Sequence, residues 1–303
     1  MASEGDGQEL QEILEEHYGA SENSAFSIET FGDHLHHGYY ENELQLDING
    51  ALNEDLATLA REAAVRLTDK IFLWTNIPDG CGRGPPQKML DVGMGLGAVS
   101  RYFAHKLPHA SVQGISVLKF EVEMATKLTA AENLSDKVSF LVADAQKLPF
   151  PDNEYDLVVC LECADHISDR EQLMKELARV TAPGGQIVLT TLCKRDLLPH
   201  ETSLSESEKE NLENICDGLA LAPWSPPSLY LKLAQEYGLQ AIQSENWTKN
   251  VTLGLAICVQ LYKNSNISEH IAEKNSIAYS ALLTAYEQGL IEYFVFKAVK
   301  PSA

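Results

Sequence analysis

The sequence is poor in positive charge and has no long apolar run. Its 303 residues include 23 Lys and Arg against 44 Asp and Glu, which gives a formal net charge of −21. A chain this acidic lacks the excess of cations that neutralises nucleic-acid phosphates or anionic lipid headgroups, so neither is expected as a partner. No stretch reaches the roughly 18 apolar residues of a membrane-spanning helix, and the acidic N-terminal segment is unlike a secretory signal. We therefore expect no membrane insertion and a cytoplasmic location.

Cysteine is also scarce, and its spacing does not suggest a metal centre. Among the six cysteines, Cys160 and Cys163 form one C-x-x-C pair, but no second pair or His pair follows at the spacing of a zinc finger. Packing in a buried strand explains them better, because reduced thiols are the default in a long chain without a secretory signal. His34, His36 and His37 lie close together, yet nothing places them on a helix where i, i+3 or i+4 neighbours share a metal. We expect no metal.

From Lys88 onward, strand and helix patterns alternate along the chain. Short apolar runs bounded by turn residues predict the strands, and amphipathic stretches between them predict the helices. Strands that alternate with helices of this length specify a parallel, doubly wound sheet with right-handed crossovers. We therefore expect an α/β fold with a doubly wound, mostly parallel sheet of seven strands. The predicted strands are 88–92, 111–116, 138–142, 155–161, 186–192, 239–247 and 291–299, and the helices of the alternating part are 97–107, 118–133 and 168–181.

Helical segments on both sides of this core predict a lid and a cap. Apolar residues recur at helical spacing from Leu10 to Tyr18 and from Leu56 to Ile71, and a run rich in Gly and Pro separates them from the core. After the fifth strand the alternation stops at a polar, mostly helical segment, and a further helix is predicted over 268–289. The predicted division is an N-terminal helical lid (1–77), a linker (78–87), the core (88–195), a cap inserted after strand five (196–236) and a C-terminal completion of the core sheet (237–303).

The most informative stretch is a glycine-rich turn between the first core strand and helix, which reads LDVGMGLG over 90–97. Glycine permits positive φ and lets a ligand lie against bare backbone. Dinucleotide-binding folds use a similar turn, but they place an acid about 20 residues further on for the ribose, and the next strand here ends at Ser116. A carboxylate at position 91 would repel a pyrophosphate, whereas it suits the ammonium and sulfonium of S-adenosyl-L-methionine. The turn therefore predicts that Asp91, Gly93, Gly95 and Gly97 bind that cofactor.

Further motifs follow in the same order along the core. Asp144, at the end of the third strand, can accept the exocyclic amine of adenine while the N–H of Ala145 donates to a ring nitrogen. The runs LPFPD at 148–152 and LARVTAPGG at 177–185 come next. As a set, these motifs resemble the core of class I S-adenosylmethionine-dependent methyltransferases over residues 88–195. The resemblance implies further cofactor contacts from Ser116 and Glu121, at the ribose, and from Val117 and Leu161.

Outside the core, the sequence resembles the γ-tocopherol methyltransferase-like family, which includes tocopherol C-methyltransferases and related plant alkaloid N-methyltransferases. GDHLHHGYY at 32–40 and TLCKRDL at 191–197 carry much of this likeness. The resemblance implies methyl transfer to a small metabolite, with S-adenosyl-L-homocysteine as the second product. Shorter matching stretches lie at 215–217, 222–224, 245–247 and 286–291.

Methyl transfer is an in-line displacement, so the protein contributes mainly by positioning the two reactants. An amine must be neutral and a phenol deprotonated when it attacks, so a base that titrates near neutrality helps. His166, just after the fourth strand, is the first candidate for this catalytic base, with Glu162 beside it. His36 and His37 of the lid are the second candidates. Aromatic rings near the site would suit a cationic amine. The residues expected to bind the substrate are His37, Tyr39, Tyr40 and Trp224.

The acceptor atom is less determined than the cofactor. We favour the nitrogen of an amine or alkaloid-like compound of specialised metabolism, and the alternatives are C-methylation of a phenol or quinol and O-methylation of a natural product. The absence of an acid for the ribose and the position of Asp91 argue against a nicotinamide oxidoreductase. The intact glycine and acid motifs argue against a non-catalytic methyltransferase-like binding or scaffold protein. The expected partner is a small-molecule substrate, and whether the chain forms a homodimer is left open.

Overall fold

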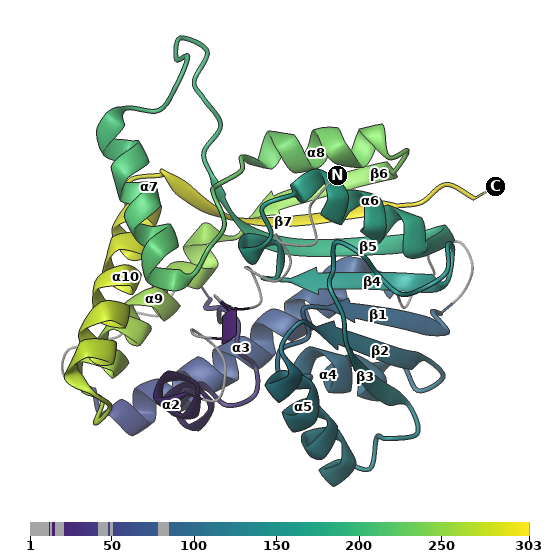
Figure 1. Ribbon diagram of the computed structural model, residues 1–303, viewed down its shortest axis with the longest axis horizontal. Coiled ribbons are helices and arrows are strands. Elements are labelled where there is room, and N and C mark those ends of the chain that lie inside the picture. The colour runs from purple at the N-terminus through teal and green to yellow at the C-terminus, as the bar shows by residue number, and fades with distance from the viewer. Residues whose placement is uncertain are drawn as a thin grey trace.

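A seven-stranded sheet forms the centre of the molecule (Figure 1). The computed structural model describes residues 12, 14, 15, 21–41, 48, 51–77 and 85–302. The strand order is β3-β2-β1-β4-β5-β7-β6, in which β1 to β5 run parallel and β7 runs antiparallel to both neighbours. The doubly wound, mostly parallel sheet predicted from the sequence is therefore confirmed. The strands are β1 (Lys88–Val92), β2 (Ser111–Ser116), β3 (Val138–Val142), β4 (Tyr155–Leu161), β5 (Thr181–Lys194), β6 (Gln240–Asn246) and β7 (Ile291–Val299).

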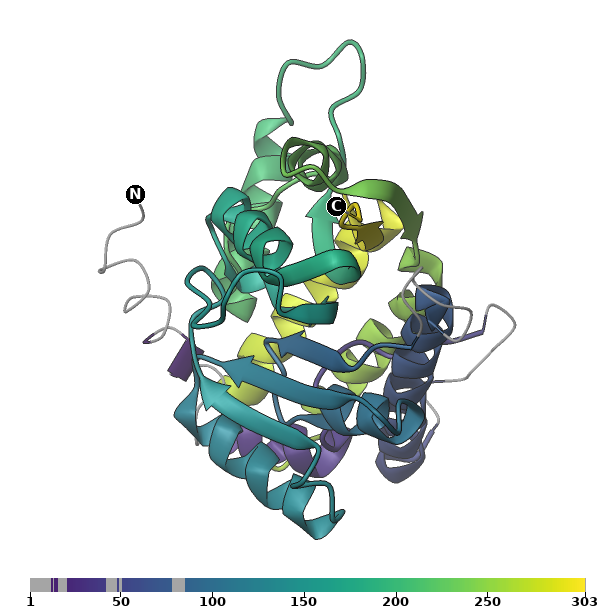
Figure 2. The same cartoon turned by 90° about the vertical axis from the view of Figure 1, so that its right-hand side faces the viewer.

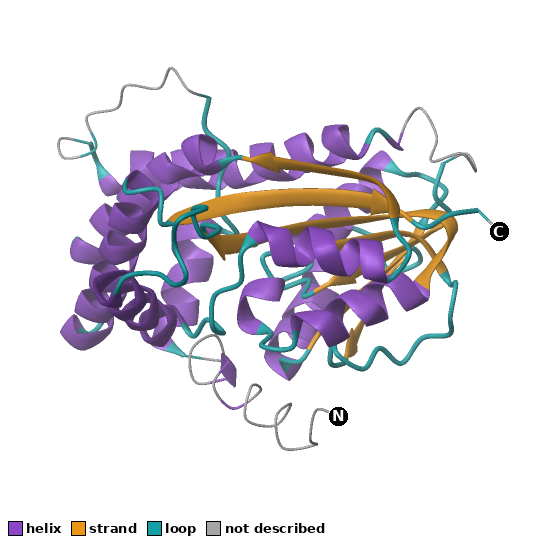
Figure 3. Cartoon of the chain, turned by 90° about the horizontal axis from the view of Figure 1, so that it is seen from above, coloured by secondary structure: helices purple, strands orange, loops and turns teal. Residues whose placement is uncertain are grey.

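Both faces of the central strands are buried, and the strand sequences show why. Successive side chains of a strand point to opposite faces, and in β4 Leu157 and Val159 enter one apolar cluster while Val158 and Cys160 enter another. The first cluster includes residues of α3 and α4, and the second includes residues of α6 and α8, so helices cover both faces (Figure 3). This explains why the core strands read as continuous apolar runs. The helices on the sheet are α3 (Asn53–Thr75), α4 (Ala98–Lys106), α5 (Lys119–Ala131), α6 (Arg170–Val180) and α8 (Pro227–Glu236).

A lobe of helices lies beyond the carboxyl ends of the parallel strands. Helix α10 packs along α9 and α7, α9 also contacts α3, and α3 contacts α2. Figure 1 shows this lobe to the left of the sheet, and in Figure 2 α10 (yellow) lies behind the strands. None of the described helices combines the length and the apolar character that a bilayer crossing requires. The remaining elements are α2 (Glu22–Phe31), the short 3-10 turn η2 (Ala164–His166), α7 (Glu206–Leu219), α9 (Thr248–Lys263) and α10 (Glu269–Glu287).

Two helices, α2 and α9, were not predicted from the sequence. Helix α2 lies in a segment rich in turn-forming residues, and it is stabilised at its start by Ser21, whose side chain accepts the N–H of Ser24 at 3.2 Å. Helix α9 is apolar on several faces, and its apolar residues are buried between α10 and α3. The predicted opening helix around Leu10, Ile13, Leu14 and Tyr18 falls almost wholly outside the described residues, as does most of the predicted linker 78–87.

The segment predicted as a cap after β5 contributes one helix to the helical lobe and one to the sheet. Helix α7 packs against α10 in the helical lobe, where it buries Leu212 and Ile215. Helix α8 packs against α6 and β6, where Tyr230 and Leu233 join the second apolar cluster. The structure therefore separates two helices that the sequence pattern groups together at 196–236. The five-part division of the chain stays a prediction.

Candidate active site

A cavity of about 300 Å³ lies where the carboxyl ends of the parallel strands face the helical lobe. The turns after β1 to β4, the segment 33–40 and helices α2, α3, α9 and α10 all contribute to its walls. Ligands of doubly wound sheets bind at this edge, because the parallel strands end there together. The cavity is lined by fourteen of the seventeen predicted site residues, which are Asp91, Gly93, Gly95, Ser116, Val117, Glu121, Asp144, Ala145, Leu161, Glu162, His166, His36, His37 and Tyr40.

Three glycines in the turn after β1 have left-handed backbone, and a side chain at each would meet different surroundings. The φ angles are +73° at Gly93, +52° at Gly95 and +75° at Gly97. A Cβ on Gly93 would come within 2.3 Å of Cys163, and one on Gly97 within 2.7 Å of the Phe140 ring. A Cβ on Gly95 would meet no atom within 4 Å, so its bare backbone faces open space in the cavity wall. Gly97, which does not line the cavity, lets the turn pack against β3, and Gly95 leaves room for a ligand.

Asp91 is a buried carboxylate at the end of β1. Only 2% of its surface is exposed, and Ser100 Oγ donates a hydrogen bond of 2.6 Å to its Oδ2. Burial raises the pKa of Asp91 to about 6, although the Ser100 hydrogen bonds oppose the rise. No cationic side chain contributes to this shift. A ligand that brings an ammonium group into the cavity would supply the charge that a buried carboxylate needs.

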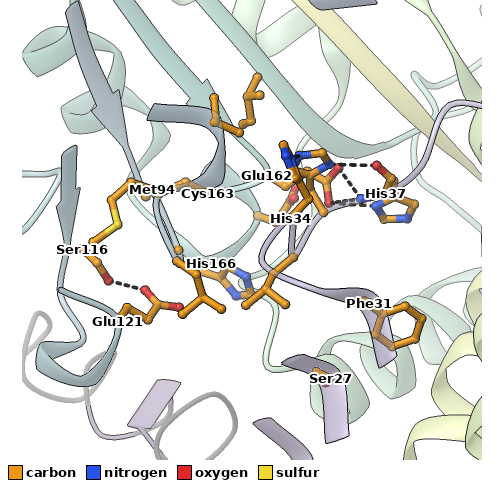
Figure 4. A pocket seen from close by; sticks show the side chains of 18 of the residues that line it. Ser27, Phe31, His34, His37, Met94, Ser116, Glu121, Glu162, Cys163 and His166 are labelled. Carbon is orange, nitrogen blue, oxygen red and sulfur yellow. Dashed lines mark hydrogen bonds and ion pairs between the residues drawn. The ribbon is translucent and has the colours of Figure 1, made fainter. Parts of the chain in front are cut away.

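Two more acids follow the neighbouring strands β2 and β3. Ser116 Oγ donates a hydrogen bond of 2.5 Å to Glu121 Oε2, and it accepts the N–H of Leu118 at 3.0 Å (Figure 4). Burial raises the pKa of Glu121, and the Ser116 hydrogen bond opposes that rise. Asp144 Oδ1 accepts the N–H of Gln146 at 2.8 Å, which fixes the turn after β3. These groups present hydrogen-bond acceptors at the end of the cavity formed by β2 and β3.

His166 lines the cavity immediately after β4. Its Nδ1 lies 2.8 Å from the carbonyl oxygen of Ala220. Because a carbonyl oxygen only accepts, Nδ1 carries the proton, and in the neutral ring the lone pair is on Nε2. The adjacent Asp165 is buried, and it accepts the N–H of Leu192 at 2.6 Å and the hydroxyl of Thr191. Burial raises the pKa of Asp165 against these hydrogen bonds.

Glu162 and His37 form a buried ion pair in the cavity wall (Figure 4). Glu162 accepts the Nδ1–H of His37 at 2.8 Å, the backbone N–H of His37 at 3.0 Å and the hydroxyl of Tyr293 at 2.7 Å. Burial alone would raise the pKa of Glu162, but the charge and hydrogen bond of His37, together with His36, lower it to about 2. Burial alone would lower the pKa of His37, but the charge and hydrogen bond of Glu162 outweigh it and raise that pKa. Because the pKa of His37 is raised above its ordinary value of 6.5, both groups are ionised at about pH 6.

Both ring nitrogens of His36 have partners within the protein. Its Nδ1 donates to the carbonyl oxygen of His37 at 2.8 Å, and its Nε2 lies 3.1 Å from Thr68 Oγ1 and 3.1 Å from His34 Nδ1. Burial lowers the pKa of His36, and burial together with the charge of His36 lowers the pKa of His34 to about 3. Both rings are therefore neutral at physiological pH. A base role for His36, predicted from its residue type, would require it to leave these partners.

The predicted substrate residues separate into those that line the cavity and those that pack elsewhere. Tyr40 is buried in the cavity wall. The preceding Tyr39 packs edge-on against Trp247, with ring centroids 5.4 Å apart, and Trp224 Nε1 donates to the carbonyl oxygen of Leu212 at 2.9 Å. Neither Tyr39 nor Trp224 lines the cavity. Adjacent residues of an extended segment point in opposite directions, so only one of the two tyrosines can face the ligand.

Sequence reasoning missed Asp165, Cys163 and Tyr293. The first two lie within the run ECADH at 162–166, beside the predicted Glu162 and His166, so that run carried a usable signal. Tyr293 lies on β7, and nothing local in the sequence connects it to Glu162. It reaches that carboxylate because β7 is inserted in the sheet next to β5.

The strand order, the glycine turn after β1 and the acids after β2 and β3 define a class I S-adenosylmethionine-dependent methyltransferase. The residues fit that cofactor, because Asp91 offers a buried acceptor for an ammonium and the open backbone at Gly95 leaves space beside it. Within the described residues, no group of three or more His, Cys, Asp or Glu side chains is placed to hold a metal ion.

Comparison with known proteins identifies the family. The sequence matches the family described as methyltransferase domain over residues 90–189. It is 33% identical over 279 residues to a probable chloroplastic tocopherol O-methyltransferase of Oryza sativa subsp. japonica, covering 89% of this chain and 74% of that protein. It is 34% identical over 221 residues to norajmaline N-methyltransferase of Rauvolfia serpentina, covering 73% of this chain and 72% of that protein. The chain belongs to the γ-tocopherol methyltransferase-like family, and its methyl donor is S-adenosyl-L-methionine.

Solved structures agree on the fold. A putative sarcosine dimethylglycine methyltransferase from Galdieria sulphuraria superimposes with a TM-score of 0.74 at 18% sequence identity, covering 97% of this chain and 98% of that one.

Proposed function

We propose that this methyltransferase transfers the methyl group to a nitrogen atom of an apolar amine, as in alkaloid-like metabolites. The observation that carries the proposal is the charge of the cavity wall. None of the described residues that line the cavity is Lys or Arg. Six acids line it instead, which are Asp33, Asp91, Glu121, Asp144, Glu162 and Asp165. Two of them are already paired, Asp33 with Arg101 and Glu162 with His37.

This distribution of charge favours one class of acceptor over others. A phenolate, a carboxylate or a phosphate would enter a wall without a compensating cation other than the His37 imidazolium, which is already paired with Glu162. An amine enters as its ammonium form, which the acids attract, and it becomes a nucleophile when it loses that proton. Towards the helical lobe the wall is mainly apolar, with Phe31, Ala64 and Leu255, so it suits a hydrocarbon body attached to the nitrogen.

The chain's own residues account for binding and proton transfer in this proposal. S-adenosyl-L-methionine supplies a methyl group activated by its sulfonium. Asp91 holds the ammonium end of the donor, the bare backbone of Gly95 approaches it, and Ser116 with Glu121 accepts the ribose hydroxyls. Asp144 and the N–H of Ala145 bind the adenine, and Val117 and Leu161 pack beside it. His166 accepts the acceptor's proton at Nε2, because its Nδ1–H is held by Ala220.

A second candidate is methylation of a phenol or quinol, at ring carbon or oxygen. Its support is the 33% identity with the rice protein described as a probable tocopherol O-methyltransferase. A phenol would need to be deprotonated beside acids that are already ionised, which raises its pKa and slows attack.

The two candidates are separated by matched acceptors. The protein is incubated with isotopically labelled S-adenosyl-L-methionine and pairs of ring compounds that differ only in an amine or a phenolic hydroxyl, and the products are read by mass spectrometry. We expect label on the amines. Label on phenols, with none on the matched amines, would make the second candidate the function. Calorimetry with S-adenosyl-L-homocysteine, expected to bind with a stoichiometry of about 1:1, checks the cofactor site independently.

Location and assembly are proposals as well. A cytoplasmic location is tested by imaging a tagged full-length protein, and the rice relative is described as chloroplastic, so a plastid signal is the opposing result. Light scattering on the purified protein decides between a monomer and a homodimer. Absence of binding to duplex DNA at low salt is the expected result for so acidic a chain.

A further inference from the structure

The segment of residues 33–40, which we call the lid loop, crosses the cavity and is fastened at four places. One of them is Thr68 of α3, whose Oγ1 lies 3.1 Å from both His36 Nε2 and His34 Nδ1. At its start, Asp33 pairs with Arg101 of α4, which also donates to the carbonyl oxygen of Leu96 in the glycine turn at 2.8 Å. At its end, the backbone of Tyr39 and Tyr40 is hydrogen-bonded to α3 and α9. The middle of the loop is held by the His37–Glu162 contacts, at the point where the loop faces the cavity.

Glu162 is built to make this middle attachment. It follows β4 directly and has a φ of +52°, a left-handed conformation that strains any residue with a side chain. That backbone is held by its own N–H, which donates to the carbonyl oxygen of Thr190 at 3.0 Å. Strained backbone of this kind persists where the surrounding contacts require it, and it is concentrated at functional sites. In Glu162 this backbone conformation directs the carboxylate toward His37 of the lid loop and Tyr293 of β7.

The hydrogen bonds of Glu162 argue against a proton-transfer role. Its two oxygens accept the backbone N–H and Nδ1–H of His37 and the hydroxyl of Tyr293. A general base needs a lone pair directed at the substrate and a pKa near the working pH, whereas the pKa of Glu162 is lowered to about 2. The carboxylate is ionised and already bonded at any pH at which the enzyme works.

We propose that Glu162 is a positioning residue, which fastens the lid loop across the cavity through its ion pair with His37 and so controls exit of the spent cofactor. The proposal rests on the cofactor entering this cavity, as the proposed function states. Opening the loop for exchange breaks this buried ion pair, while the attachments at both ends of the loop stay in place. Lids of this kind often limit turnover, because product leaves only when they open.

The pair should respond to pH through His37. Its pKa is raised, so the imidazolium is present below that raised value and is lost as the pH rises through it, which weakens the attachment. Glu162 stays ionised over the whole range. The other titratable groups that face the pair are His36 of the lid loop, Asp165 after β4, Cys258 of α9, Tyr286 of α10 and Tyr293 of β7. Asp33 and His34 face His36 instead.

The experiment measures the dissociation rate of S-adenosyl-L-homocysteine by stopped-flow displacement between about pH 7 and pH 9. In the wild-type protein the rate should rise with pH. In Glu162→Gln it should be at least about tenfold faster at pH 7 and nearly independent of pH, since the ion pair is gone. Tyr293→Phe removes a neutral donor and keeps the pair, so it should show a smaller increase and keep the pH dependence.

Two further variants separate fastening from general destabilisation. Glu176→Gln breaks a partly buried ion pair, with Arg179 on α6, away from the cavity, and should leave the dissociation rate as in wild type. The double variant His37→Gln/Glu162→Gln should be no faster than Glu162→Gln alone, because one attachment can be lost only once.

The outcomes are distinct. Equal acceleration in Glu162→Gln and Glu176→Gln, or additive effects of the His37 and Glu162 changes, would overturn the proposal. So would a pH dependence that survives in Glu162→Gln. Absence of S-adenosyl-L-homocysteine binding in the wild-type protein would instead contradict the proposed function.

Discussion

Asp91→Asn should make the ligand-free protein more stable and its cofactor binding weaker. Asn has nearly the same shape and still accepts the hydrogen bond from Ser100, but it carries no charge. The pKa of Asp91 rises from 3.8 to about 6 on folding because of burial. At about 1.36 kcal/mol per pH unit, keeping this carboxylate ionised at pH 7 costs about 3 kcal/mol of stability. Removing the charge should recover part of that free energy of unfolding. For a chain of this length, recovery of all of it would raise the Tm by about 5 °C.

The same substitution removes the charge that we assign to the cofactor's ammonium. A hydrogen bond to a charged partner contributes about 1.5–3 kcal/mol, so the affinity for S-adenosyl-L-homocysteine should fall about 10- to 150-fold. Differential scanning calorimetry without ligand and titration calorimetry with it measure the two effects separately. A lower Tm for the ligand-free variant would refute the argument from burial. An unchanged affinity would refute the role of Asp91 in binding, whatever the Tm.

Three further predictions follow from the site. His166→Ala should lower turnover about 100-fold or more and leave the affinity for S-adenosyl-L-homocysteine within about twofold, and full turnover would remove His166 as the base. Gly95→Ala and the control Gly238→Ala both place a Cβ in open space at positive φ, so each should lose about 1–2 kcal/mol of stability in urea unfolding, but only Gly95→Ala should weaken cofactor binding. In titrations at falling pH, wild-type affinity should decrease by up to about tenfold per pH unit below pH 6, because Asp91 takes up a proton there, and this dependence should be absent in Asp91→Asn.

Much of the fold was predictable because the local patterns are strong. The strands β1 to β4 and β7 have the predicted bounds, since each is an apolar run between turn residues. Helices α2 and α9 were missed. The first lies in a turn-rich stretch and is held by α3, and the second is apolar on several faces and is held between α10 and α3.

The candidate site was predictable on the cofactor side and much less so on the acceptor side. Asp91, Gly95, Glu121 and Asp144 all lie at or after the carboxyl ends of strands of one parallel sheet, so their sequence positions alone bring them to one edge. The acceptor side is built from segments far apart in the sequence. No local pattern specifies that Tyr40 rather than Tyr39 lines the cavity, or that Tyr293 contacts Glu162, because both depend on tertiary packing.

The sequence by itself determined the class of protein, because the order of strands, glycines and acids along a doubly wound sheet dictates which side chains meet at its carboxyl edge. It also determined the acidity of the chain. Only the tertiary structure decided what individual groups can do. Glu162 and His36 are both chemically suited to proton transfer. Yet the charge and hydrogen bond of His37 leave Glu162 ionised and bonded to the lid loop, and burial leaves His36 neutral with both ring nitrogens engaged. The reason is that a side chain's pKa and its available lone pairs are set by its neighbours in space, and those come from elements that the sequence separates by many residues.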